Sequence, residues 1–459
     1  MKKTLVLIWQ ESFFCQCLVW LTRKLRLTLT SSFLWKVWRW MDTHIIQSRW
    51  VQAILDPKHL TNAYYASTFY KKGTLWIRRL SFVTPKPSLP WNSLAISAFL
   101  AVVLLIPESF CSATFLFGAF LTVAIFYFAH HRLMRTGMVF AMVCLLLTIF
   151  GVLFALALPS SAAKTLSYLL LGVCFFFLIS FAIRTAEDFV KALRCIYLLL
   201  LLLCALGFFQ QEVFGSTARA TFLDSVTFGE VMVLLFPFAF IAPMTFSSTP
   251  RRIAYLIPLL MLTFSAVTAT QSRAAFIGFS AELLLLILLF DWRYLPMLLF
   301  LAPAMTGTAI ENIVAMWDVP KSYGNFFINL ISAFRQVWSN GFGIRRGVFL
   351  DFYSNALTAE TGPLAVSPLY FSFLLELGML GLLFFLWYLL RLAHSTLTSI
   401  FTAKKEFRGF FVAGFAMLIG ISVSSLLEAS LFSPRIFLLY WGMLGLLRAA
   451  RIIRFGIVH

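Results

Sequence analysis

The chain has 459 residues, of which 61% are hydrophobic and only 12% are charged, and its formal net charge is +19. Soluble proteins are about 45–50% apolar and about 25% charged. The composition therefore excludes a soluble globular protein, and its high hydrophobicity excludes a disordered chain. A basic excess fits either nucleic acid or an anionic membrane surface, and a chain this apolar favours the membrane.

Residues 1–91 form a basic, tryptophan-rich extension. They hold eight of the 13 Trp residues, among them Trp35, Trp38 and Trp40, interleaved with Lys and Arg. Trp favours the membrane interface, and Lys and Arg favour anionic headgroups. The pattern predicts amphipathic helices that lie on the cytoplasmic membrane surface.

Residues 92–459 are predicted to form an all-α polytopic bundle of about 12 transmembrane helices. A span needs about 20 mostly apolar residues. Runs of this kind lie near 91–106, 111–128, 137–158, 165–183, 189–212, 228–247, 253–269, 274–290, 294–310, 368–390, 408–427 and 435–450.

The distribution of Lys and Arg predicts the orientation of these spans. With both termini in the cytoplasm, most of the 37 basic residues lie inside, as the positive-inside rule requires. Only eight lie outside, and the opposite orientation would invert the bias. The eight are Lys164, Arg219, Arg273, Lys321, Arg335, Arg345, Arg346 and Arg435.

One predicted outer loop, residues 311–367, is much longer than the others. Loops of this length are usually functional. Phe327, Leu330 and Phe334 fall on one face of a predicted helix within it, which would rest on the bilayer or cap the bundle.

Three arginines on the outer side are the candidates for substrate binding. Arg219 and Arg273 lie in short turns between apolar spans, and Arg335 lies on the amphipathic helix of the long loop. A guanidinium stays charged and matches phosphate oxygens with forked donors. Each arginine alone also fits a headgroup contact, but their convergence would suit a lipid-linked diphosphate.

Four motifs in this order resemble the O-antigen ligase/polymerase-like membrane proteins. They are RATFLDSVTFGEVMVLLFPF, TQSRAAFIGF, FRQVWSNGFGI and LYFSFLLELGMLGLLFFL, the last holding the Glu-x-Gly of Glu376, and the resemblance covers about residues 210–390. It implies a GT-C-like bundle with one large outer loop and an active site on the outer face.

The resemblance also implies an activity. Such proteins transfer a glycan from an undecaprenyl-diphosphate-linked donor to a glycan or lipid acceptor during cell-surface polysaccharide assembly, without metal or cofactor. Arg219, Arg273 and Arg335 would hold the diphosphate. The absence of Cys-x-x-Cys pairs among the seven cysteines also disfavours a structural zinc site.

The chain departs from the family pattern at the expected base. Ser367 and Pro368 stand where family members usually carry a histidine, and all six histidines are predicted on the cytoplasmic side. A carboxylate would have to serve instead. The outer carboxylates considered for this role are Glu360, Asp351 and Asp224.

Two alternatives stay open at this stage. The missing histidine fits a non-catalytic relative that binds lipid-linked glycan. A transporter or flippase is less favoured, because Glu230 and Glu282 interrupt apolar spans but no internal repeat accompanies them. A nucleic-acid partner is not predicted, since the basic residues follow the membrane topology.

Overall fold

The computed structural model describes residues 185–222, 224–246, 248–290, 307–317, 369–403, 405–428 and 433–455, together with 40, 97, 100–106, 172, 175–176, 179–180, 183 and 431. The chain divides into two compact units, Met1–Thr74 and Leu75–His459. All helices named below belong to the second unit. The predicted boundary at residue 91 falls outside the described residues.

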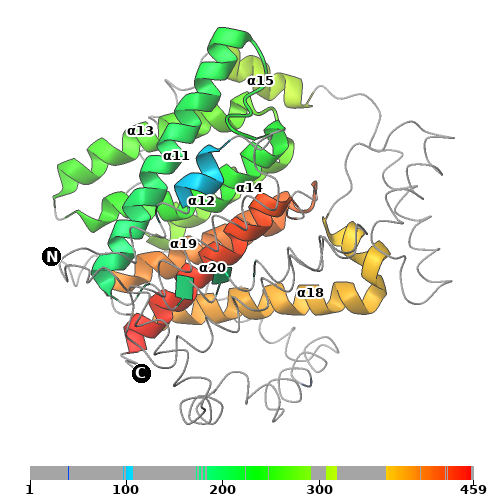
Figure 1. The fold of residues 1–459 in the computed structure, drawn as a ribbon. Helices are drawn as coiled ribbons and strands as arrows, with labels where there is room; N and C mark the ends of the chain where they lie inside the picture. Colours follow the sequence, from blue (N-terminus) through cyan, green and yellow to red (C-terminus); the bar gives the residue numbers. More distant parts are fainter. Residues whose placement is uncertain are drawn as a thin grey trace, which may run out of the picture. The chain divides into compact units, whose positions relative to one another are not determined.

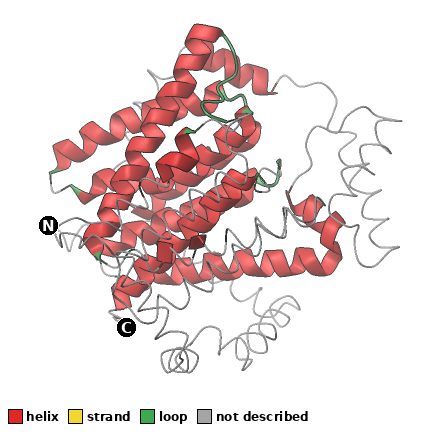
Figure 2. Ribbon diagram, in the orientation of Figure 1, coloured by secondary structure: helices red, strands yellow, loops and turns green. Residues whose placement is uncertain are grey.

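All elements named in the described residues are helical (Figures 1 and 2), as the sequence predicts. Within the described part of the chain, five stretches are long and apolar enough to cross a membrane: Ala186–Phe214, Ser225–Thr245, Thr249–Ala269, Gly381–Thr402 and Phe407–Ser424. The elements are α11 (Ala186–Phe214), α12 (Ser225–Ile241), the 3₁₀ helix η2 (Ala242–Thr245), α13 (Thr249–Ala269), α14 (Arg273–Phe290), α15 (Gly307–Trp317), α18 (Leu369–Thr402), α19 (Lys405–Ser424) and α20 (Pro434–Phe455).

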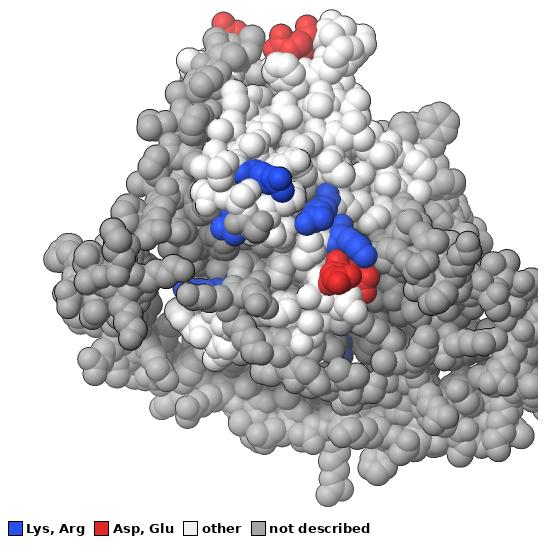
Figure 3. Space-filling view, turned by 90° about the vertical axis from the view of Figure 1, so that its left-hand side faces the viewer, with Lys and Arg blue, Asp and Glu red and all other residues white. Residues whose placement is uncertain are grey.

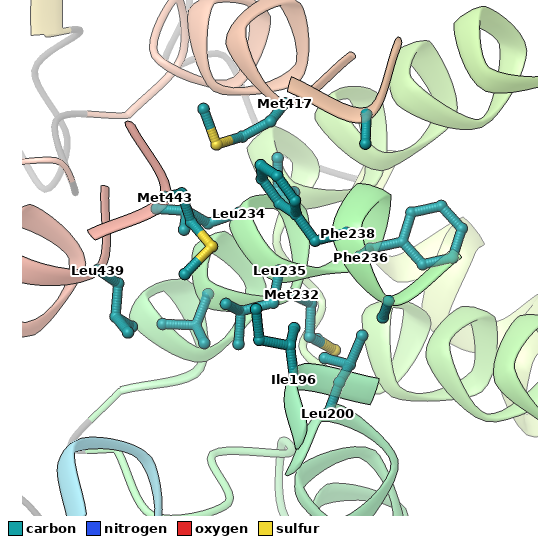
Figure 4. Close-up of a cluster of buried hydrophobic side chains, with 14 of the residues drawn as sticks. Ile196, Leu200, Met232, Leu234, Leu235, Phe236, Phe238, Met417, Leu439 and Met443 are labelled. Atoms are coloured by element: carbon teal, nitrogen blue, oxygen red, sulfur yellow. The ribbon is translucent and has the colours of Figure 1, made fainter. Parts of the chain in front are cut away.

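Helix α12 is the central element of these helices. Every residue from Thr227 to Ile241 is buried, and α12 contacts α11, α13, α14, α19 and α20. A helix that is apolar on all sides requires such surroundings. Figure 4 shows side chains of α12 meeting those of α11, α19 and α20. The labelled residues are Ile196, Leu200, Met232, Leu234, Leu235, Phe236, Phe238, Met417, Leu439 and Met443.

Helix α11 has defined caps at both ends and one exposed apolar face. The Thr185 side chain accepts a hydrogen bond from the Asp188 N–H at 3.1 Å, and Gly215 ends the helix at φ +60°, where glycine is favoured. A stripe of large apolar side chains is exposed along this helix, which suits lipid rather than water. It consists of Leu198, Leu202, Leu206, Phe209 and Val213.

Two helices extend past their predicted limits. Helix α15 continues to Trp317, inside the predicted loop 311–367, because Ala309, Asn312 and Met316 recur at helical spacing on its buried side. Helix α18 continues to Thr402, beyond the predicted end at residue 390. Its polar last turns are held by Arg451, whose guanidinium donates to the Ser395 carbonyl at 2.6 Å.

The helices bring one group of loops together at what we call the polar end of the bundle. It comprises residues 215–222, 224, 270–272 and 425–428 and the start of α20. The Ala218 N–H donates to the Ala269 carbonyl at 3.0 Å, and the Leu369 N–H donates to the Ser425 carbonyl at 3.0 Å. These bonds join segments that are far apart in the sequence.

The opposite end, which we call the basic end, contains the start of α11, α13 and α19 and the end of α18 and α20. The Arg252 guanidinium donates to the Phe246 carbonyl at 2.7 Å, and Arg194 lies 5.1 Å from the centre of the Phe246 ring. On the face drawn in Figure 3, Lys and Arg side chains gather near the middle beside a group of acidic ones, and other acidic side chains lie at the upper edge.

Candidate functional site

Arg219 lies at the polar end in the segment that joins α11 to α12. Its side chain is exposed and makes no hydrogen bond or ion pair with any residue that the structure describes. The backbone beneath it is fixed by Gln210, whose Oε1 accepts from the N–H groups of Arg219 (3.1 Å) and Ala220 (2.7 Å). Gln210 Nε2 also donates to the Ala220 carbonyl at 2.8 Å. The segment therefore presents an exposed guanidinium on a fixed backbone.

Arg273 is the first residue of α14 and is half-buried. Its Nε donates to the Met316 carbonyl, and its guanidinium carbon lies 5.8 Å from the centre of the Trp317 ring. Both partners belong to the end of α15. These contacts orient the Arg273 guanidinium at the start of α14.

Both arginine turns contain a non-glycine residue with left-handed backbone. Ala220 has φ +48° and Gln271 has φ +55°, a conformation that is uncommon for such residues and often marks functional sites. Gln271 is held by its Nε2, which donates to Asn312 Oδ1 at 2.8 Å. Side-chain amides therefore stabilise the backbone beside each arginine.

Asp224 serves as the N-cap of α12. Its Oδ1 accepts from the Thr227 N–H at 2.5 Å and its Oδ2 accepts from Thr227 Oγ1 at 2.9 Å. Such bonds are typical of a capping carboxylate. The role of base that the sequence allowed for Asp224 stays a prediction, and capping already engages both of its oxygens.

Glu428 is the acidic residue at the polar end that the sequence analysis missed. It follows α19, is only partly exposed, and its Oε2 accepts from Ser272 Oγ at 3.4 Å. Burial raises the pKa of this carboxyl to about 7. The Ser272 hydrogen bond acts in the opposite direction, and the nearby charge of Asp224 raises the pKa further. A carboxyl that ionises near neutral pH is suited to general-base chemistry.

Arg435, at the start of α20, makes contacts that indicate a structural role. It is 1% exposed, and its guanidinium donates to the carbonyls of Ile106 (2.5 Å) and Thr221 (3.4 Å). It also lies 5.2 Å from the centre of the Phe222 ring. Arg435 thus anchors the segment that carries Arg219. The sequence did not distinguish the two arginines, because it predicted both of them on the outer side.

The structure brings two of the three predicted diphosphate-binding arginines to the same end of the bundle. The Ala218–Ala269 backbone bond links the segment of Arg219 to the end of α13, and only three residues separate that end from Arg273, the first residue of α14. Arg335, Asp351 and Glu360 lie outside the described residues. Their roles stay predictions.

Glu428 gave only a weak signal in the sequence. It directly follows the apolar run 408–427, so it reads as an ordinary polar residue at the end of a span. Its significance comes from Ser272, 156 positions away, and no local pattern predicts that contact.

The described polar end therefore combines the exposed Arg219 and the oriented Arg273 with one carboxyl that ionises near neutral pH. Such a set can bind an anionic leaving group and accept a proton from a hydroxyl. Comparison of the chain with family models and with curated proteins gives no match. The functional assignment accordingly rests on the motifs and on the geometry of this end.

Proposed function

We propose that the chain transfers a glycan from an undecaprenyl-diphosphate-linked donor to a glycan or lipid acceptor. The observation that carries this proposal is the placement of Arg219 and Arg273 at one end of the bundle. The Arg219 side chain is exposed there and makes no hydrogen bond or ion pair with the described residues. Guanidinium groups placed beside a departing diphosphate stabilise the charge that develops on it. Arg335 on the loop 311–367 would complete the set.

We place the polar end on the outer face of a membrane and both termini in the cytoplasm. The described cations support this orientation because they are more frequent at the basic end. Lys191, Arg194, Arg251, Arg252, Arg408, Arg448 and Arg451 lie toward that end, against Arg219, Arg273 and Arg435 at the other. The proposal retains about 12 spans in a GT-C-like bundle.

Glu428 is the base that we assign to the reaction in place of the missing histidine. Its carboxylate would remove the proton from the acceptor hydroxyl as that oxygen attacks the sugar carbon, while the bond from that carbon to the diphosphate breaks. Its position next to Ser272, the residue before Arg273, supports the assignment. Asp224 is less suitable because Thr227 occupies its two oxygens.

The test is a transfer assay on the purified full chain in lipid nanodiscs. The donor is an undecaprenyl-diphosphate oligosaccharide, supplied with polysaccharide and lipid acceptors. Arg219→Ala is expected to lower kcat/KM by about 10- to 100-fold, which corresponds to the loss of one charge-assisted hydrogen bond of about 1.5–3 kcal/mol. Arg273→Ala is expected to have at least this effect.

Arg251→Ala is the matched control, because Arg251 is equally exposed but lies at the basic end. It should transfer at the wild-type rate. Equal turnover by wild type, Arg219→Ala and Arg273→Ala would refute the proposed site. Donor binding that depends on Arg219, without transfer to any acceptor, would support a non-catalytic glycan-binding protein instead.

A further inference from the structure

Two carboxyl groups lie deep inside the bundle, away from the polar end. Glu230 on α12 is 1% exposed and Glu282 on α14 is fully buried. They follow the first residues of their helices, Ser225 and Arg273, by five and nine residues, which corresponds to about 8 and 14 Å along the axis. The proposed transfer reaction makes no use of either residue.

The two carboxyls face successive turns of α19. Ser424 Oγ donates to Glu230 Oε2 at 3.0 Å. Gly420, one turn earlier, lies against Glu282, because a methyl group added at Gly420 would overlap the Glu282 side chain. The two carboxyls also interact electrostatically with each other. They therefore form one site at the crossing of α12, α14 and α19.

Glu282 has no partner among the described residues that could balance a negative charge. Neither of its carboxyl oxygens has a hydrogen-bond partner in the part of the chain that the structure describes. The charged residues of the helices around it lie near their ends: Arg251 and Arg252 on α13, Arg273 on α14, and Lys405, Glu406 and Arg408 on α19. Beyond the last turn of α19, Glu428 adds another acid.

Two glycines make the room that the Glu282 side chain occupies. Gly278 permits the close approach of α14 and α19, since an added Cβ there would lie 3.1 Å from both the Gly420 carbonyl oxygen and Ser424 Cβ. Together with Gly420, this glycine gives the space that Glu282 occupies. An apolar side chain would fill the same space without the cost of burying a polar group.

We propose that Glu230 and Glu282 form a proton-binding site, with Glu282 carrying the proton at neutral pH. An ionised, unpaired carboxylate in this position would be strongly disfavoured, and two adjacent carboxyls do not ionise independently. A divalent metal fits less well, because no group of three or more His, Cys, Asp or Glu suited to a metal occurs among the described residues.

The site has a short connection to the polar end. Gly420, Ser424 and Glu428 recur every four residues, so they follow one face of α19 and its continuation. Ser424 contacts Glu230, and Glu428 contacts Ser272 at the polar end. Glu428 is thus the ionisable residue at the polar end of this face.

The test is labelling with dicyclohexylcarbodiimide, an apolar reagent that reacts with protonated carboxyls. The acid adds across the carbodiimide, its proton moves to nitrogen, and the O-acylisourea rearranges to a stable N-acylurea. The whole reagent is retained, and peptide mass spectrometry locates it.

With the full chain in lipid vesicles, we expect the adduct on Glu282. Above the pH at which the pair ionises, labelling should fall about tenfold per pH unit.

Exposed Glu311 on α15 is the internal control and should stay unlabelled in the same digest. E282Q, checked for folding by gel filtration, should lose the adduct. Absence of label from both buried residues of wild type would overturn the proposal, as would labelling that does not depend on pH. Protection by Na⁺ at constant pH would also overturn it, because the site would then bind a metal cation.

Discussion

Ser272 Oγ lies 3.4 Å from Glu428 Oε2 and thereby joins the turn before α14 to the end of α19. Ser272 directly precedes Arg273. The contact therefore places Glu428, the proposed base, near Arg273, a proposed diphosphate-binding residue. The same end of α19 leads inward through Ser424 to Glu230. The surface site and the buried carboxyl pair are therefore connected through one helix.

Glu428→Gln should change the pH dependence of transfer. A base acts when it is deprotonated, so wild-type kcat/KM should rise up to about pH 7 and level off above it. The variant should be at least tenfold slower and lose the rise around pH 7. A pH–rate profile of both proteins is the measurement. An unchanged profile in the variant would exclude Glu428 as the base.

The same substitution should alter stability with a definite sign. Because the folded state raises the pKa of Glu428 from 4.5 to about 7, folding favours its protonated form. The resulting stabilisation is complete below about pH 4.5 and is lost as the pH rises to about 7. Glu428→Gln removes this dependence, which we estimate at about 1–3 kcal/mol. Unfolding in detergent micelles at pH 5 and pH 8 measures it.

Gln210→Leu should release the segment that carries Arg219. Three hydrogen bonds from one side chain fix the backbone of Arg219 and Ala220. Their loss should cost about 1–3 kcal/mol and lower transfer by raising the KM for the donor more than it lowers kcat. The neighbouring Gln211→Leu is the control, because the Gln211 side chain makes no hydrogen bond within the described chain. Equal effects of the two variants would contradict a positioning role.

Hydropathy predicted where the described helices lie, whereas the functional contacts required the structure. The apolar runs 189–212, 253–269 and 408–427 coincide with α11, α13 and α19 because a membrane span must satisfy its own backbone. Glu230 and Glu282 were visible only as unusual residues within apolar runs. Their proximity at α19 depends on Gly420 and Ser424. Packing between helices that are far apart in the sequence produces no local sequence pattern from which it could be predicted.

Gly420→Ala tests the packing at the buried carboxyl pair. The added methyl group would overlap the Glu282 side chain, so we expect a loss of about 1–3 kcal/mol in the free energy of unfolding. In an E282A background the space is free, and the same change should cost less than about 1 kcal/mol. This double-mutant cycle measures the coupling directly. Additive effects would show that Gly420 does not make room for Glu282.

The orientation can be tested at the two ends of α11. Lys191 and Glu212 are both exposed and are separated by 21 residues of one helix, or about 31 Å, close to the hydrocarbon thickness of a bilayer. In a cysteine-free background, E212C should react with an impermeant maleimide added to intact cells, whereas K191C should react only after the membrane is permeabilised. The reverse pattern would place Arg219 and Arg273 on the cytoplasmic side, where no transfer at the outer face could use them.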